Sequence, residues 1–146
     1  MQNISFDDGY KSFCINNDES KVVRFNPSDY GLLERFSKAR KTIMQEVNSL
    51  NEEVNLKVDG TSTDGLDETA ELIEKVRNII NGQIDFIFNA EVSKIAFGNQ
   101  SPISTIKGKF LFERFLDAVG PLMEKEIKAE QAASEKRISK YTKQVK

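Results

Sequence analysis

The chain has 146 residues, of which 38% are hydrophobic and 30% are charged, and its formal net charge is −2. This length fits a single domain with a hydrophobic core of its own. The sequence has no histidine and one cysteine, Cys14, so disulfides within the chain are excluded, which suits a reducing compartment. It also has no apolar run of about eighteen residues that could span a membrane and no signal-peptide pattern at its start. We therefore expect a cytosolic protein.

The charge is unevenly distributed along the chain. From Glu124 to the end there are six lysines and one arginine against four glutamates, a net charge of +3, which leaves −5 for residues 1–123. Because glutamates alternate with the lysines, this pattern is typical of a solvated helix with neighbouring ion pairs. No basic cluster belongs to a known nucleic-acid-binding motif. We expect neither nucleic acid nor a membrane as a partner.

The N-terminal part predicts a β-hairpin. Residues 12–15 and 21–25 are β-prone, and the segment 16–20 between them has the composition of a turn. A lone hairpin is marginally stable in water, so one face must pack against a helix. The apolar residues of that face are Phe13, Ile15, Val23 and Phe25.

A helix should follow the hairpin. Asn26 and Pro27 fit the N-cap and the first helical position, and the helix should run to about Ser49. Its apolar stripe consists of Leu32, Phe36, Ala39, Ile43, Val47 and Leu50. Residues 51–67 are acidic and rich in glycine, serine and threonine, which predicts a mobile connector.

The stretch Ile84–Met123 should form the core, since it holds six of the ten phenylalanines. A preceding helix from about Leu66 should end at Asn81-Gly82. Two facing helices should then be separated by a stop at Gly98 and a start at Ser101-Pro102. Their predicted apolar stripes are Ile84, Ile87, Phe88, Val92 and Ile95, and Phe112, Phe115, Leu116, Val119 and Met123.

The last segment predicts a long helix. Gly120-Pro121 should kink or interrupt it, and residues 124–146 have high helix propensity. Their larger apolar residues are Ile127, Ile138, Tyr141 and Val145. The chain is thus predicted to be mainly α, with about four to five helices, an N-terminal β-hairpin and a long C-terminal helix. It should form one domain, with a body at residues 1–123 and a charged helical extension at 124–146.

No arrangement of residues indicates catalysis. Without histidine it would depend on carboxylates, lysine, tyrosine, serine or Cys14, and Cys14 lies in a predicted strand, where a buried or edge thiol is the expected reading. One acidic cluster does not follow the ligand order of an EF-hand and fits a solvated loop and helix start; it comprises Asp59, Asp64, Asp67 and Glu68. We expect no enzyme, cofactor or metal site.

Four segments carry a resemblance to a known family. They are FNPSDYGLLERF, IDFIFNAEVSKIAFGNQSPIS, GKFLFERFLDAVGPLMEKEIKAE and KRISKYTKQVK. In this order, and after a hairpin, they make the chain similar to the small tail assembly chaperones of long-tailed phages and prophages of Gram-positive bacteria. The resemblance extends over roughly residues 13–146.

This resemblance implies a non-enzymatic role in the host cytoplasm. Such a chaperone coats the long helical tape measure protein, keeps it soluble and helps recruit tail tube subunits, and it is absent from the mature virion. Amphipathic partner helices present apolar anchors every three or four residues, and many weakly bound copies would add up through avidity. Our candidate partner-binding residues are Ile127, Ile138, Tyr141 and Val145. Alternatively, this face folds back on the body or pairs with another copy, which would make a homo-oligomer.

A different function is compatible with the same features. A small phage-encoded protein that inhibits or regulates a host protein, as in counter-defence, would also be short, acidic and free of catalytic motifs. The position of the gene distinguishes the two, because a chaperone gene should lie between the tail tube gene and a very long tape measure gene.

Overall fold

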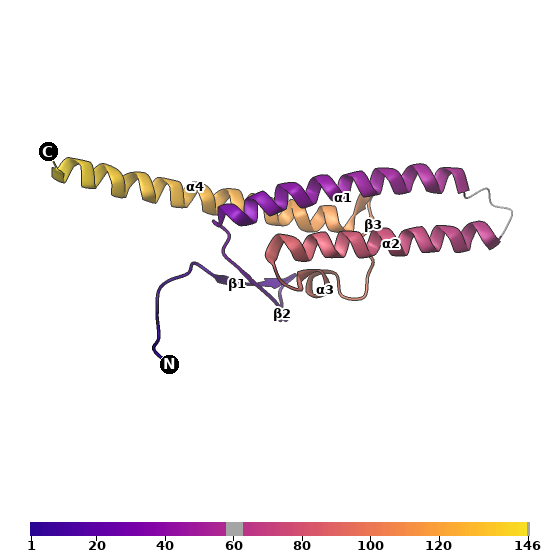
Figure 1. Cartoon of the computed structure of the whole chain (residues 1–146), viewed down its shortest axis with the longest axis horizontal. Helices are drawn as coiled ribbons and strands as arrows, with labels where there is room; N and C mark the ends of the chain where they lie inside the picture. The colour runs from indigo at the N-terminus through magenta and orange to yellow at the C-terminus, as the bar shows by residue number, and fades with distance from the viewer. Residues whose placement is uncertain (58–62, 146) are drawn as a thin grey trace.

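The structure is a computed structural model that describes residues 1–57 and 63–145 (Figure 1). This described part is mainly α-helical, with an N-terminal two-stranded hairpin and a long C-terminal helix, as the sequence predicted. The elements are β1 (Lys11–Ile15), β2 (Asp18–Phe25), α1 (Tyr30–Lys57), α2 (Thr63–Phe88), α3 (Val92–Phe97), β3 (Thr105–Ile106), β4 (Lys109–Phe110) and α4 (Leu111–Val145).

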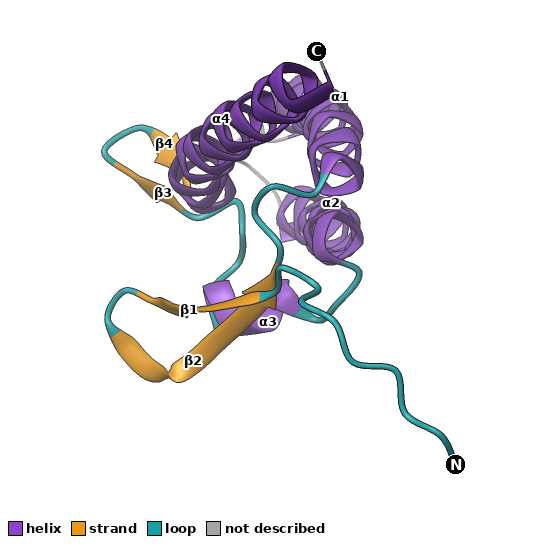
Figure 2. Ribbon diagram, turned by 90° about the vertical axis from the view of Figure 1, so that its left-hand side faces the viewer, coloured by secondary structure: helices purple, strands orange, loops and turns teal. Residues whose placement is uncertain are grey.

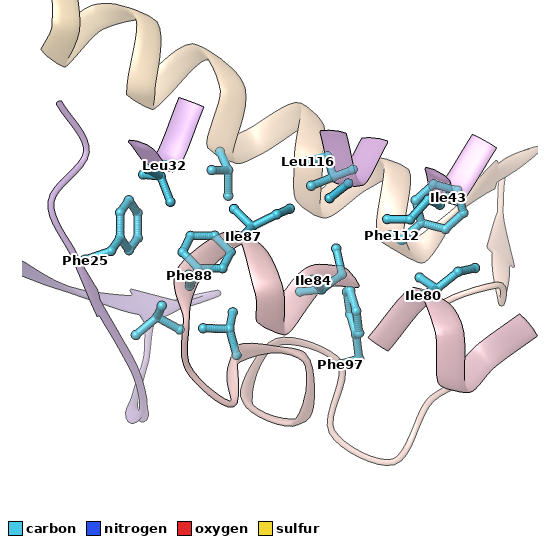
Figure 3. Packing of buried hydrophobic residues seen from close by; sticks show 14 of the residues in the cluster. Phe25, Leu32, Ile43, Ile80, Ile84, Ile87, Phe88, Phe97, Phe112 and Leu116 are labelled. Atoms are coloured by element: carbon cyan, nitrogen blue, oxygen red, sulfur yellow. The ribbon is translucent and has the colours of Figure 1, made fainter. Parts of the chain in front are cut away.

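The helices and the hairpin are arranged around one core. Helices α1 and α2 run side by side in opposite directions, and the first half of α4 lies alongside them (Figures 1 and 2). The β1–β2 hairpin and α3 lie together on another side of the molecule (Figure 2). All of these elements contribute side chains to one cluster of buried apolar residues, part of which is shown in Figure 3.

The first hairpin has a tighter turn than predicted. Asn16 and Asn17 have positive φ angles of 51° and 62°, which is the backbone of a two-residue hairpin turn. Strand β2 therefore begins at Asp18 instead of Lys21. The carboxylate of Asp18 accepts hydrogen bonds from the Ser20 hydroxyl and backbone N–H at 2.6 and 3.0 Å, which lowers the pKa of Asp18.

The inward face of the hairpin is the predicted one. Val23 and Phe25 are buried, and Phe13 and Ile15 are half-buried against the core. Phe13 also stacks on Phe25, with 4.7 Å between the ring centroids. The hairpin is thus held by apolar packing against the helices.

Helix α1 begins later than predicted. Asn26 and Pro27 lie in a turn before the helix. The N-cap is Asp29, whose carboxylate accepts a hydrogen bond of 2.8 Å from the backbone N–H of Gly31. The buried stripe of α1 nevertheless agrees with the prediction, because the helical period does not depend on the starting residue.

The predicted connector is shorter than expected. Helix α1 continues to Lys57 and α2 already begins at Thr63, so most of residues 51–67 are helical. Residues 58–62 of the predicted mobile segment lie outside the described residues.

The predicted helix end at Asn81-Gly82 is wrong, because α2 runs through both residues. A glycine inside a helix costs about 1 kcal/mol. Ile80 and Ile84 on either side are fully buried, and burial of one such side chain contributes about 1.5–3 kcal/mol. The chain turns instead at Asn89, which has a φ of 52°. The predicted helix that carries Ile84 to Ile95 is therefore not continuous, and its stripe is divided between α2 and α3.

The segment between α3 and α4 differs from the prediction in one respect. Gly98 ends α3 as expected, with a φ of 61° and its N–H donated to the carbonyl of Lys94 at 2.9 Å. Ser101-Pro102, however, forms a turn that leads into the small β3–β4 hairpin. The carbonyl of Pro102 accepts the backbone N–H of Phe112 at 2.9 Å, which ties this turn to the start of α4.

Pro121 does not interrupt α4. The helix is continuous from Leu111 to Val145 (Figure 1) although proline lacks the N–H of one helical hydrogen bond. Val119 and Met123, which flank the Gly120-Pro121 pair, are both buried. Their packing holds the helix together across this position.

The core can be tested at Ile84, which is fully buried where α2 meets α4 (Figure 3). Ile84→Ala should lower the free energy of unfolding by about 2–5 kcal/mol, since it removes buried methyl groups and leaves a cavity. Ile73→Ala in the exposed part of the same helix is the matched control and should cost less than half as much. Urea denaturation followed by circular dichroism measures both, and equal losses would contradict this description of the core.

Candidate functional site

The second half of α4 projects from the body of the molecule (Figure 1). Glu126 still contacts the body, because its carboxylate pairs with the ammonium of Lys11 at 3.1 Å. Ile127 is half-buried, and every side chain from Lys128 to Lys143 is exposed. We refer to residues 128–145 of α4 as the C-terminal arm.

The candidate partner-binding residues fall into three groups. Ile127 lies at the base of the arm and lines a groove on the body. Ile138 and Tyr141 are 53% and 68% exposed, and their spacing of three places them on one face of the helix. The side chain of Val145 lies outside the described residues. The structure thus leaves Ile138 and Tyr141 without an intramolecular cover and connects Ile127 to the body.

The groove that receives Ile127 lies between α1 and α4 and has a volume of about 750 Å³. We call it the α1–α4 groove. Leu33 and Met44 of α1 are exposed at its surface, and Phe36 lies between them. The apolar residues that line it are Leu33, Phe36, Met44, Phe112, Leu116, Pro121, Met123 and Ile127.

Sequence reasoning did not identify the α1 side of this groove. Leu33, Phe36, Arg40 and Met44 follow each other at steps of three or four, so they form a stripe on one side of α1, of which only Phe36 belongs to the predicted apolar stripe. That spacing was the one feature of the sequence from which this side of the groove could have been predicted. It could not show that α4 lies next to this stripe, because α1 and α4 are far apart in sequence.

Charged residues surround the apolar floor of the groove. Asp117 pairs with Lys109 at 2.8 Å, and Glu124 pairs with Lys128 at 2.8 Å. The hydrogen bond from Lys128 lowers the pKa of Glu124 and raises the pKa of Lys128. An apolar floor with charged edges matches an amphipathic helix, which buries one face and keeps its charged residues in water.

The described residues contain no cluster of metal-ligating side chains. Within residues 1–57 and 63–145, no three histidine, cysteine or acidic side chains gather as a metal site would require. Asp59 and the side chain of Asp64 lie outside the described residues. Cys14 is exposed on β1, which pairs only with β2 among the described residues, so it is an edge thiol and not a buried one. No helix among these residues is long and apolar enough to cross a membrane.

The candidate residues thus lie on two apolar surfaces: Ile127 lines the α1–α4 groove, and Ile138 and Tyr141 are exposed on the arm. No protein-family model, curated protein or solved structure matches this chain.

The separation of arm and body predicts the effect of truncation. A chain that ends at Gln131 should lose less than about 1 kcal/mol of unfolding free energy, since the removed side chains that the structure describes are all exposed. A chain that ends at Pro121 also loses the buried Met123 and should be strongly destabilised. Thermal and urea unfolding of both chains measure the difference, and equal destabilisation would mean that the arm belongs to the core.

Proposed function

We propose that this protein is a non-enzymatic tail assembly chaperone of a long-tailed phage or prophage. It binds the tape measure protein in the host cytoplasm and helps recruit tail tube subunits around it, without remaining in the mature virion. One observation carries the proposal beyond the resemblance: an apolar groove on the body leads directly onto a helical arm with exposed apolar residues.

The dimensions of this surface fit a helical partner. Leu33 and Met44 are eleven residues apart on α1, which corresponds to about 16 Å or three helical turns. A partner helix in the groove would therefore place three or four apolar anchors on the floor. The arm extends the same side of the molecule by roughly 26 Å, as its eighteen helical positions imply.

The charges of the two parts suit reversible binding. The body is acidic and the arm is basic, at −5 for residues 1–123 and +3 from Glu124 onward. A long amphipathic partner with both signs of charge can meet complementary charges on body and arm, which favours association rate and orientation more than affinity. Many copies along one tape measure protein would supply the total affinity through avidity.

The arm can be tested by charge substitution. The double variant Ile138→Asp, Tyr141→Asp should reduce copurification with the co-expressed tape measure protein at least about tenfold, because it removes two apolar contacts. Ala129→Asp adds a carboxylate to the opposite face of the same helix and should leave binding unchanged. Melting temperatures of all variants should stay within a few degrees of the wild type.

The groove needs a separate test on α1. Met44→Asp should weaken the same complex by a similar factor, and the neighbouring Gln45→Asp, which lies outside the groove, should not. If the wild-type chain forms no complex with the tape measure protein, the proposed function is wrong, and inhibition or regulation of a host protein becomes the leading candidate. If the arm variant binds normally but Met44→Asp does not, binding is confined to the groove.

A further inference from the structure

The first eight residues form an extended tail that leaves the body (Figures 1 and 2). We call this segment the N-terminal tail. Ile4 and Phe6 are its large apolar residues besides Met1, and they are 86% and 77% exposed. Residues two positions apart point to the same side of an extended chain. The tail therefore presents an apolar face that nothing within the described chain covers.

The root of the tail is fixed in direction. Gly9 has a φ of 75°, and a Cβ atom on it would lie 2.6 Å from the side-chain nitrogen of Asn26. The carboxylates of Asp7 and Asp8 accept the backbone N–H groups of Gly9 and Tyr10 at 3.0 and 3.1 Å. These contacts hold the chain at the point where it turns away from its own hairpin.

A second groove lies on the other side of α4, next to the hairpin. It has a volume of about 410 Å³, and we call it the β1–α4 groove. The apolar residues that line it are Phe13, Ile15, Val23, Phe25, Ala96, Phe97, Ile106, Leu111, Phe115, Ala118, Val119 and Leu122. Its walls are therefore the β1–β2 hairpin and α4, with smaller contributions from α3 and β3.

The groove runs along the unpaired edge of β1. Four consecutive residues, 13–16, line it from β1 and its turn, whereas β2 contributes only its inward-facing Val23 and Phe25. Strand β1 pairs with β2 alone in the described chain, so its other edge has free backbone groups. Figure 2 shows β1 as the hairpin strand nearer to α4 and β3. An extended peptide can add to such an edge and place alternate side chains against the flanking helix.

The tail and this groove are both apolar, and they carry opposite charges. Arg114 lines the groove, and its guanidinium donates a 2.7 Å hydrogen bond to the carbonyl of Ile106. It forms no ion pair with any residue in the described ranges. Asp7 and Asp8 likewise have no cationic partner there, since their hydrogen bonds go to backbone N–H groups. Pairing of the tail with the groove would bring opposite charges together.

We propose that the N-terminal tail of one copy adds as a third strand to the free edge of β1 in a second copy, with Ile4 and Phe6 in the β1–α4 groove. The second copy is the occupant because the tail is directed away from its own groove at Gly9. Each copy has one tail and one groove, so repeated contacts give a ring or a row, and a mutual exchange gives a dimer. This self-association is independent of the proposed function, because it concerns the purified chain alone.

Disulfide trapping tests the contact directly, since Cys14 on β1 is the only natural cysteine. With Ile4 and Phe6 facing the groove, Ser5 lies on the outer face of the added strand, as Cys14 does on β1. Facing residues of neighbouring strands have a spacing that a disulfide can bridge. Under mild oxidation, Ser5→Cys should therefore form disulfide-linked dimers or larger species on a non-reducing gel.

Two control variants define the outcome of the trapping experiment. Ser5→Cys combined with Cys14→Ser should lose these species, and Ser20→Cys, on β2, should not form them above the level of the wild type. A monomer in which both thiols have been consumed would mean that the tail folds back on its own groove, which overturns the proposal. Free thiols after oxidation would also overturn it.

Sedimentation of the uncrosslinked protein gives an independent measurement. The wild type should associate with rising concentration, and Phe6→Asp should raise the dissociation constant at least about tenfold, as expected for loss of one large buried apolar side chain. Asn3→Asp adds the same charge to the outer face of the tail, away from Ile4 and Phe6, and should have little effect. Because the tail is exposed, both variants should melt as the wild type does. A wild type that stays monomeric at the highest soluble concentration, or equal association of Phe6→Asp, would contradict the inference.

Discussion

A continuous series of aromatic contacts joins the β1–β2 hairpin to α2, α3 and α4. The ring of Phe13 stacks on Phe25 with 4.7 Å between centroids, and Phe25 meets Phe88 edge-on at 5.0 Å. Phe88 lies 6.0 Å from Phe115, which in turn contacts Phe97 at 5.7 Å. These five rings come from β1, β2, α2, α4 and α3. Since such pairs contribute beyond their burial, the hairpin, the short helix and the start of α4 depend on one another.

This core determines what α4 can do. The first half of the helix is held by Phe112, Leu116, Val119 and Met123, all of which are buried. Charged and small residues follow, and they supply no further apolar stripe dense enough to pack. Helix propensity and ion pairs such as Glu124 with Lys128 then support the arm. One helix thus serves as a core element along half of its length and as an exposed element along the other half.

Helix α4 also separates the two grooves. Its residues Glu113, Asp117 and Glu124 face the α1–α4 groove, whereas Arg114 and Ala118 face the β1–α4 groove. A partner helix on one side and a second copy on the other would therefore not compete for the same surface. Many copies could then stand side by side along a long polypeptide, with each contact weak by itself and the sum strong. In that arrangement self-association and partner binding would reinforce each other, because neighbouring copies raise the local concentration of binding sites.

Prediction from the sequence worked where local spacing decides the outcome. The hairpin face, the mainly helical class and the burial of Ile84 on α2 and of Leu116 on α4 follow from periods of two and about 3.6 residues. The helix boundaries predicted at Asn81-Gly82 and Ser101-Pro102 were wrong. Glycine, asparagine, serine and proline only weaken a helix or permit a turn. Burial of apolar side chains against residues distant in sequence contributes more free energy than these local preferences.

The residues of the candidate site were likewise predicted only in part. The apolar residues of the C-terminal segment were identified from sequence, and the structure places Ile138 and Tyr141 on an exposed arm and Ile127 in a groove. Leu33 and Met44 were missed as site residues, because a groove exists only where two helices come together. By itself the sequence determined which residues are apolar and with what local period they recur. The tertiary structure alone decided which of those residues have neighbours to cover them, since burial depends on contacts between segments far apart in the chain.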